Sequence, residues 1–403
     1  MKIKYGLISC DSHGQVDRDA FTKRMSKEKF GDRIPHLIET KEKAHMAWPS
    51  ERPVHRWLVN DMVVDIRSPS NCPALWDDPL RLNGPQRWEE VPRAAYDPAE
   101  RLKVLDADGI DGEVLFPNPP VQNVTFFEGD AEFELACVQA HNDAMAEWQQ
   151  TSDRYVPMAL IPHLTNIETT VGEVERAAKM GFRGILMVAE PSVAVKAADT
   201  FKIGGSNPAL KGLKHFCDPY WEPLWAACQD LQMPIHWHGN GGLGLPMPMW
   251  KEYDQGQMRS AITAPAFSIL GQFLPNLVFS GVLDRYPRLH WVCAETGIGW
   301  LNYVLEACDH EWERHHLWTQ GIVTRPSELF RRQVHVSFWF EYRGVESRHK
   351  LGLDNIMWQS DFPHNVSTYP DSWKFVDQRL SGVPADERKK LLYGNAVQLY
   401  RLE

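Results

Sequence analysis

Short apolar runs alternate with longer amphipathic stretches from about residue 100 to the end of the chain. The runs have the length of β-strands, and the stretches between them carry apolar residues three and four positions apart, as an α-helix requires. This alternation is typical of repeated β/α units with a parallel sheet. The predicted strands are Tyr5–Cys10, Gly112–Phe116, Tyr155–Leu160, Gly184–Val188, Pro234–Trp237, Leu277–Ser280, Leu289–Cys293, Val334–Ser337 and Ile356–Gln359. The clearest predicted helices are Ala131–Thr151, Ile167–Met180, Glu222–Gln232 and Trp300–Trp312.

Residue types that bind metals stand at the ends of three predicted strands. They are Asp11 and His13 at the first strand, His236 and His238 at a central strand, and Asp361 at the last. Strand ends so far apart in sequence meet only if the fold brings the carboxyl edges of the strands together, as a parallel β/α barrel does. We therefore predict an α/β fold of the TIM type, a (β/α)8 barrel.

Residues 17–98 interrupt the alternating pattern. They are rich in Pro, Trp, Arg and His and show no clear period. A bare barrel needs about 250 residues, so this 403-residue chain has room for a long insertion within one domain spanning residues 1–403. Because the stretch directly follows the first strand, we predict an insertion that caps the mouth of the barrel.

The spacing of the candidate ligands favours a metal centre. Asp11 and His13 are two positions apart, so their side chains point to the same side of an extended strand, and His236 and His238 have the same relation. Asp361 completes a mixed nitrogen and oxygen set, which suits Zn, Fe or Mn better than Ca or Mg. The alternative for Asp11 and His13 is an aspartate that caps a turn beside a hydrogen-bonded histidine.

Three further histidines have two interpretations each. His236 is either a direct ligand or substrate contact, or a buried partner of the ligands. His163 follows a predicted strand, where it either touches substrate or belongs to a turn. His364, three residues after Asp361, either orients the substrate or a water molecule, or is a hydrogen-bonded loop histidine.

Composition limits the partners. The net charge is −10 and no Lys/Arg cluster occurs, which argues against binding to nucleic acid or to an anionic membrane. No unbroken run of 18 apolar residues is present, so no membrane span is predicted. The seven cysteines are odd in number and lack CxxC pairs, a pattern that fits reduced thiols in a cytoplasm. We expect a small-molecule substrate.

Four motifs together resemble one family. They are Asp11-Ser-His13, Asp218-Pro-Tyr-Trp-Glu-Pro-Leu-Trp225, Ala294-Glu295-Thr-Gly-Ile-Gly-Trp300 and Ser360-Asp361-Phe-Pro-His364. Over nearly the whole chain the sequence resembles the amidohydrolase-related family 2, which includes aminocarboxymuconate-semialdehyde and resorcylate decarboxylases. The resemblance implies that Asp11, His13, His238 and Asp361 are the metal ligands, and it is compatible with a homodimer.

The sequence departs from the family at Glu295, where many of its decarboxylases have a histidine that donates a proton. A carboxylate there either acts as a general acid/base or binds a second ion, with His236 and His163 as further candidates. One or two divalent ions per chain are therefore expected.

Two reactions compete. The leading hypothesis is a hydrolase that uses a metal-activated water to cleave an acyl C–O, C–N or C–S bond of a small apolar or aromatic carboxylic acid derivative. In it Asp361 is the general base, and Glu295 and His364 complete the catalytic set. The alternative is a non-oxidative decarboxylase of an aromatic or enol acid, with Glu295 protonating the ring carbon. A non-catalytic binding barrel is disfavoured because all four ligands are present.

Overall fold

The computed structural model describes most of the chain. It covers residues 1–41, 53–63, 69–81, 83–118, 120–121, 127, 129–191, 213–239, 250 and 252–402. Part of the predicted insertion and the glycine-rich residues after 239 lie outside the described residues.

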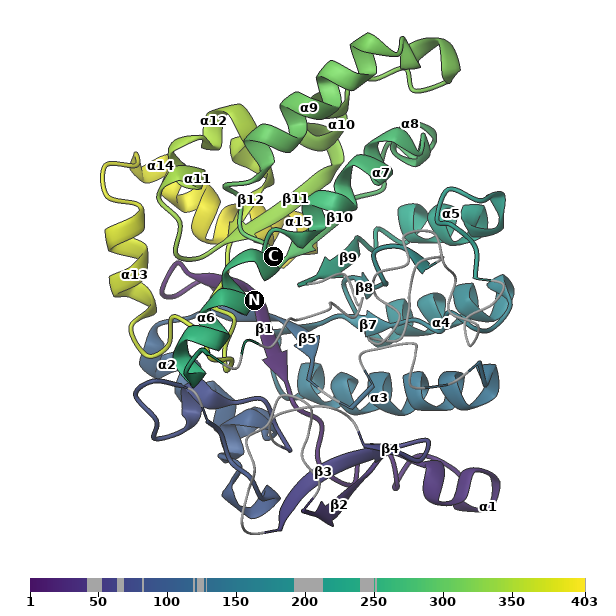
Figure 1. Ribbon diagram of the computed structural model, residues 1–403, viewed down its shortest axis with the longest axis vertical. Coiled ribbons are helices and arrows are strands. Elements are labelled where there is room, and N and C mark those ends of the chain that lie inside the picture. The colour runs from purple at the N-terminus through teal and green to yellow at the C-terminus, as the bar shows by residue number, and fades with distance from the viewer. Residues whose placement is uncertain are drawn as a thin grey trace.

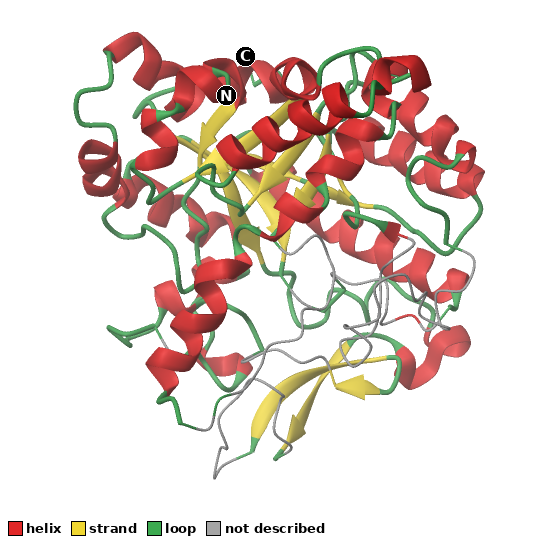
Figure 2. Ribbon diagram, turned by 45° about the horizontal axis from the view of Figure 1, so that its top comes forward, coloured by secondary structure: helices red, strands yellow, loops and turns green. Residues whose placement is uncertain are grey.

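Parallel strands form the centre of the molecule, and helices surround them (Figure 1; Figure 2). One group of strands has the order β1-β5-β6, and a second runs from β7 to β12 in sequence order, with every pairing in both groups parallel. The strands are β1 (Ile8–Gly14), β5 (Gly112–Pro117), β6 (Tyr155–Pro157), β7 (Ala159–Leu160), β8 (Ile185–Leu186), β9 (Ile235–His238), β10 (Trp291–Ala294), β11 (Val334–Phe338) and β12 (Ile356–Trp358). The predicted α/β fold with a parallel sheet is confirmed.

The two groups of strands approach each other at both ends. Only Met158 separates β6 from β7, and its N–H donates to Leu115 O at 2.9 Å. On the other side, Ser12 of β1 forms a parallel bridge with Phe362, which follows β12. The Asp361 N–H also donates to Asp11 O at 2.8 Å. The first and last strands therefore lie side by side, although some 350 residues separate them in sequence.

Side chains along the central strands alternate between two environments. On β9, Trp237 contacts the ring of Trp291 on the neighbouring β10, with centroids 5.2 Å apart, in the larger apolar cluster that includes the helices. His236 and His238, on the other side of the same strand, both contact the ring of Phe116 of β5. The two histidines therefore share one face, as their spacing predicts.

The four predicted helices are present in the structure, and one predicted strand is a helix instead. Two predicted helices have the same bounds in the structure, and the other two differ by one or two residues at one or both ends. The helices are α1 (Lys27–Phe30), α2 (Pro98–Asp108), α3 (Ala131–Thr151), α4 (Ile167–Met180), α5 (Glu222–Asp230), α6 (Gln255–Ala266), α7 (Leu274–Phe279), α8 (Val282–Arg285), α9 (Leu301–Arg314), α10 (Pro326–Gln333), α11 (Arg343–Glu346), α12 (Arg348–Leu351), α13 (Ser372–Arg379), α14 (Ala385–Lys389) and α15 (Asn395–Tyr400). The predicted strand Leu277–Ser280 is wrong, because those residues lie mainly in α7. There Leu274, Leu277 and Val278 are fully buried at helical spacing.

The stretch 17–98 contains regular structure that the sequence analysis does not predict. It includes a small antiparallel sheet of β2 (His36–Thr40), β3 (Val54–Val59) and β4 (Met62–Val63). In Figure 1 the arrow of β1 points toward this sheet, and Figure 2 shows the sheet set apart from the central strands. A backbone bond of 2.9 Å from Ala74 N–H to Pro363 O ties the stretch to the loop after β12.

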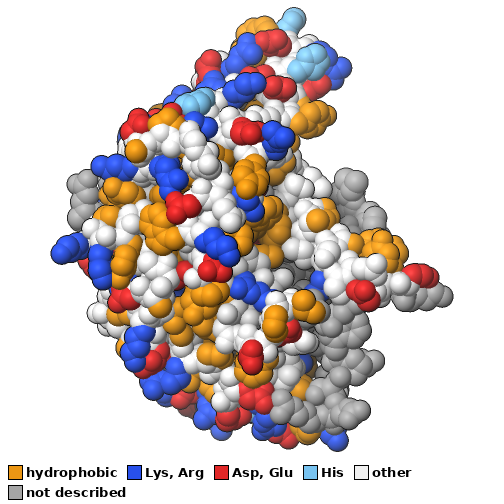
Figure 3. Space-filling model, turned by 90° about the vertical axis from the view of Figure 1, so that its left-hand side faces the viewer, with side chains coloured by type: hydrophobic (Ala, Val, Ile, Leu, Met, Phe, Trp, Pro, Cys, Tyr) orange, Lys and Arg blue, Asp and Glu red, His pale blue; other side chains and the backbone are white. Residues whose placement is uncertain are grey.

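The surface in Figure 3 carries basic and acidic side chains intermixed. No continuous basic area of the kind that binds nucleic acid is visible on this face.

One described stretch is long and apolar enough to cross a membrane by length and composition alone. It is Gly256–Phe279, with a mean hydropathy of 1.4 over its most apolar window. Polar residues interrupt it, so it is not an unbroken apolar run. In the structure it is divided between α6, a short 3₁₀ turn and α7.

Candidate metal centre

Residues from three strand ends meet in one cluster. Asp11 and His13 lie within β1, His238 ends β9, and Asp361 follows β12. His238 Nε2 lies 3.2 Å from Asp11 Oδ1, and His13 Nε2 lies 3.3 Å from Asp361 Oδ1 and 3.7 Å from Asp11 Oδ1. Ligand atoms of Asp11, His13 and His238 lie within 4.8 Å of one another, and those of His13, Asp361 and His364 do so as well. The structure thus brings together the four residues that the resemblance names as ligands.

The cluster contains buried polar atoms without a hydrogen-bond partner. They are Asp11 Oδ2, His13 Nε2 and both carboxylate oxygens of Asp361. The side chains that carry them are fully buried. Leaving such an atom unpaired costs about 1–3 kcal/mol, so the cluster is suited to a bound group that satisfies several of them at once. Two carboxylates and two imidazoles around one point fit a divalent cation.

The electrostatics of the cluster agree with this fit. Burial raises the pKa of Asp11 well above its ordinary value, and the charge of Asp361 adds to the rise. Burial also acts to raise the pKa of Asp361, but His364 and His13 outweigh it, so this pKa is lowered. Burial, followed by the neighbouring His364, lowers the pKa of His13 to about 3. His13 is therefore a neutral imidazole, which is the form that binds metals.

Glu295 stands beside the cluster at the end of β10. Its Oε2 lies 3.5 Å from His238 Nε2, and its side chain is 17% exposed, unlike the fully buried Asp11 and Asp361. Burial raises the pKa of Glu295 above its ordinary value, and the charge of Asp361 adds to this. Gln359 fixes the backbone here by accepting the Glu295 N–H at 3.1 Å.

The two carboxylates that flank the centre both have a left-handed backbone conformation. Glu295 has a φ of +55° and Asp361 a φ of +52°, a region that side chains with a Cβ rarely adopt. Conformations of this kind cost about 1–3 kcal/mol each and tend to gather at functional sites. The fold therefore holds both carboxylates in fixed, unfavourable backbone positions.

His364 is held from both sides. Its Nδ1 lies 3.0 Å from Asp361 Oδ1, its Nε2 lies 3.0 Å from Asn118 Oδ1, and its ring stacks on His13 at 3.7 Å. Asn118 is absent from the sequence-based site, yet it follows the strand Gly112–Phe116 at its carboxyl end. Asn118 can be predicted as a site residue if every polar residue at the carboxyl end of a predicted strand is considered, and not only the residue types that bind metals.

The remaining histidine candidates have other partners. His236 is fully buried, its Nδ1 lies 3.1 Å from Ile185 O, and its Nε2 lies 2.9 Å from the hydroxyl of Tyr400. The N–H of His163 donates to Glu134 Oε1 at 2.9 Å, and its Nε2 accepts the N–H of Val188 at 3.5 Å. Neither histidine belongs to the ligand groups found among the described residues.

A buried ion pair supports the loop that carries Asp361. Arg101 and Glu113 are fully buried and form two hydrogen bonds of 2.9 and 3.0 Å. Arg101 also donates to Phe362 O at 3.3 Å, and its guanidinium lies over the Phe362 ring. Because Phe362 is adjacent to Asp361, this pair restrains the position of the candidate ligand.

The chain belongs to the amidohydrolase family 2, because the family model described as Amidohydrolase matches residues 44–402. The predicted resemblance is confirmed, and membership implies an enzyme with a TIM-barrel fold. No curated protein matches the chain.

Solved structures of the same fold include a bacterial amidohydrolase and two decarboxylases. The amidohydrolase from Mycobacterium avium subsp. paratuberculosis has a TM-score of 0.72 and 19% identity, covering 99% of this chain and 98% of that chain. The 2,6-dihydroxybenzoate decarboxylase from Rhizobium has a TM-score of 0.60 and 17% identity, with 98% and 99% covered. A 5-carboxyvanillate decarboxylase from Novosphingobium aromaticivorans, with bound manganese and 3-methoxy-4-hydroxy-5-nitrobenzoic acid, has a TM-score of 0.62 and 16% identity, with 98% and 97% covered. Two of these three structures are decarboxylases and one is an amidohydrolase, and at 16–19% identity they show the fold that this chain shares with them.

Proposed function

We propose that the protein is a metal-dependent, non-oxidative decarboxylase of a small aromatic carboxylic acid. The observation that carries the proposal is the likeness of nearly the whole chain to solved decarboxylases of the same fold. Glu295, directly beside the four-residue ligand cluster at the partly exposed edge of the site, is placed to serve as a proton donor. The decarboxylases among the related folds support the choice of reaction.

Asp11, His13, His238 and Asp361 would hold the metal ion. A divalent ion bound there supplies Lewis-acid stabilisation of negative charge on the substrate oxygens. Manganese occurs in related structures, and the mixed ligand set suits it as well as zinc or iron. We assign one ion per chain, which leaves Glu295 free for proton transfer.

Glu295 is the proposed proton donor. In decarboxylation the bond between the ring carbon and the carboxylate breaks, carbon dioxide leaves with neither oxidation nor reduction, and a proton takes its place on the carbon. Glu295 delivers that proton and regains one from solvent through its exposed edge. Asp361, whose Oδ1 lies 3.3 Å from His13 Nε2 and 3.0 Å from His364 Nδ1, would carry a negative charge within the ligand cluster.

We also propose that the parallel strands form a closed (β/α)8 barrel and that residues 17–98 cover its mouth. The bridge between Ser12 and Phe362 supports closure. The bond between Ala74 and Pro363, and the bonds from Arg81 to the carbonyls of Ser367 and Tyr369, support the placement of the cap. A cap of this kind excludes bulk water from the reacting groups.

Hydrolysis is the second candidate. The observation that favours it is Glu295 itself, since many decarboxylases of this family carry a histidine in that position. In a hydrolase Asp361 would act as general base toward a water molecule, and Glu295 would protonate the leaving group.

Product analysis separates the two reactions. Manganese-loaded protein is incubated with 2,6-dihydroxybenzoate, 5-carboxyvanillate and other aromatic acids, and in parallel with aryl esters and amides. We expect carbon dioxide and the decarboxylated ring, and a rate about 10²–10⁴-fold lower in Glu295→Gln with metal content unchanged. The matched control Glu306→Gln changes an exposed carboxylate of α9 and should retain full activity. Ester or amide cleavage without carbon dioxide release would replace the decarboxylase assignment by the hydrolase.

A further inference from the structure

A pocket lies at the end of the strands opposite to the metal-ligand cluster. It has a volume of about 510 Å³ and is bordered by the end of α4, by the segments that lead into β8 and β9, and by Arg401 after α15. The candidate metal ligands lie at the carboxyl ends of the strands, whereas this pocket lies at their amino ends. The pocket is therefore separate from the site described above.

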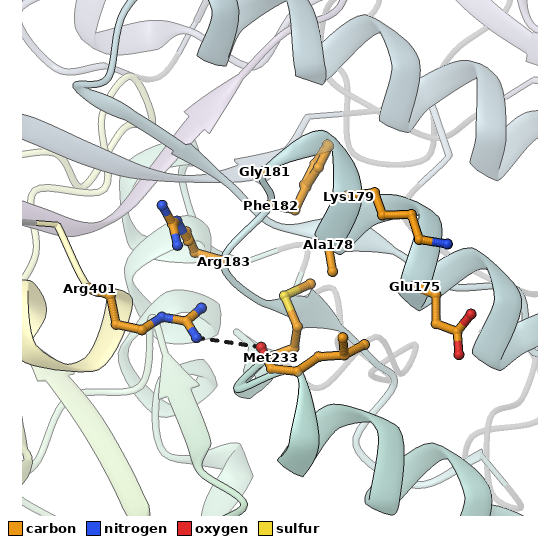
Figure 4. A pocket seen from close by; sticks show the side chains of 9 residues that line it. Glu175, Ala178, Lys179, Gly181, Phe182, Arg183, Met233 and Arg401 are labelled. Atoms are coloured by element: carbon orange, nitrogen blue, oxygen red, sulfur yellow. Dashed lines mark hydrogen bonds between the residues drawn. The ribbon is translucent and has the colours of Figure 1, made fainter.

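Two arginines dominate the charge of this pocket. Figure 4 shows the guanidinium groups of Arg183 and Arg401 on one side, with Lys179 and Glu175 on the other. Among the described residues, no carboxylate forms an ion pair with either arginine. By contrast, Arg288, which also precedes a strand, pairs with a carboxylate at 3.0 Å.

Among the described residues, the groups that bind Arg401 are neutral. It donates to Gln232 Oε1 at 2.7 Å and to Leu231 O at 3.4 Å. Its Nε is buried and has no hydrogen-bond partner. Burial, and after it the positive charge of Arg183, lower the pKa of Arg401. The two like charges thus stand close together without a carboxylate between them, an arrangement that a bound anion would relieve.

The rest of the lining indicates what kind of anion fits. Ala178, Phe182, Leu231 and Met233 give the pocket an apolar wall. Guanidinium groups bind the oxygens of carboxylates and phosphates through paired, charge-assisted hydrogen bonds. Together these features favour a ligand that carries an oxyanion on an apolar body.

We propose that the pocket lined by Arg183 and Arg401 binds a small-molecule oxyanion, a carboxylate or phosphate group attached to an apolar body, independently of the substrate site. Arg183 and Arg401 bind the oxygens, and the apolar wall receives the remainder of the ligand. This proposal stands whether the enzyme is a decarboxylase or a hydrolase.

Isothermal titration of the whole protein tests the proposal. Inorganic phosphate and benzoate are the two probes, titrated at constant ionic strength because exposed charges are screened by salt. We expect at least one probe to bind, and Arg183→Gln and Arg401→Gln each to weaken that binding about tenfold or more. Phosphate binding alone identifies the group as a phosphate, and benzoate binding alone identifies it as a carboxylate.

Two control variants locate the binding. Arg288→Gln removes an arginine that already has a carboxylate partner and should bind the probe as the parent does. Asp361→Asn alters the metal centre and should also leave the affinity unchanged, which excludes binding of the probe at that centre. The proposal is overturned if the parent binds neither probe, if neither Arg183→Gln nor Arg401→Gln weakens binding, or if either control loses it to the same extent.

Discussion

Replacing Gly239 by alanine should move Glu295 while leaving all four candidate metal ligands in the sequence. Gly239 follows His238 at the end of β9 and has a φ of +53°. A Cβ at this position would lie 2.5 Å from Glu295 Oε2, whereas ordinary contact begins at 3.4 Å. The carboxylate must therefore retreat by roughly 0.9 Å, the difference between these two distances.

The substitution should lower both the stability of the fold and the catalytic rate. An alanine in the left-handed region destabilises the fold by about 1–2 kcal/mol. A catalytic group displaced by about 1 Å lowers the rate by roughly 100-fold. We thus expect kcat/KM of Gly239→Ala to fall by about that factor, with bound metal at the level of the parent protein, because Asp11, His13 and Asp361 do not touch the new methyl group.

The assay combines initial rates, metal content by mass spectrometry and urea unfolding. Gly172→Ala is the matched control, since Gly172 lies within α4 and nothing is found within 4 Å of its added Cβ. That change should keep full activity and stabilise the protein by up to about 1 kcal/mol. Parental activity in Gly239→Ala would refute the assigned position of Glu295, and a parallel loss of metal would show that the variant damages the ligand cluster instead.

Three other changes test separate features. Arg101→Met should lower the free energy of unfolding by about 3–5 kcal/mol, because its carboxylate partner stays buried without a counter-charge. The control Arg343→Met, at a side chain that is 90% exposed, should change the free energy of unfolding by less than about 0.5 kcal/mol. Urea titrations of the two variants check both expectations. Burial lowers the pKa of His141 to about 4 from 6.5. Below pH 6.5 the native state therefore binds fewer protons at His141 than the unfolded state does. The contribution of His141 to the free energy of unfolding is complete above pH 6.5 and is lost as the pH falls to about 4. Thermal unfolding across that range should show roughly 3 kcal/mol less acid destabilisation in His141→Leu, and no change in the exposed control His310→Leu. Asp361→Asn should remove most of the bound metal, and a full equivalent retained in mass spectrometry would count against Asp361 as a ligand.

Periodicity in the sequence predicts most of the central fold because the core imposes it. The central strands are short, buried and mostly apolar, and the longer helices bury one apolar stripe each, so both leave a regular pattern. The stretch Leu277–Ser280 shows where this rule fails, since a short apolar run suits a buried strand and a buried helix equally well. The sheet from β2 to β4 escapes prediction because its short strands lie among Pro, Arg and Trp residues, whose burial depends on contacts far away in sequence.

The candidate site is predicted at the level of its residues but not of their partners. The order of residues along a strand indicates that His236 and His238 share a face, yet it does not indicate which of them reaches the ligand cluster. In the structure His236 Nε2 is bound by the hydroxyl of Tyr400, a residue 164 positions away in sequence, whereas His238 lies in the cluster. The support of Asp361 by Arg101 and Glu113 is likewise a tertiary contact without a local signal.

The side-by-side arrangement of β1 and the segment after β12 has a consequence for biosynthesis. Asp11 and His13 are synthesised some 350 residues before Asp361. Pairing over such a distance is slow compared with local helix formation. The nascent chain therefore holds two of the candidate ligands without their partner until Asp361 has been synthesised, and a metal bound before that point lacks the full set of candidate ligands. Truncated or stalled chains should consequently accumulate without metal.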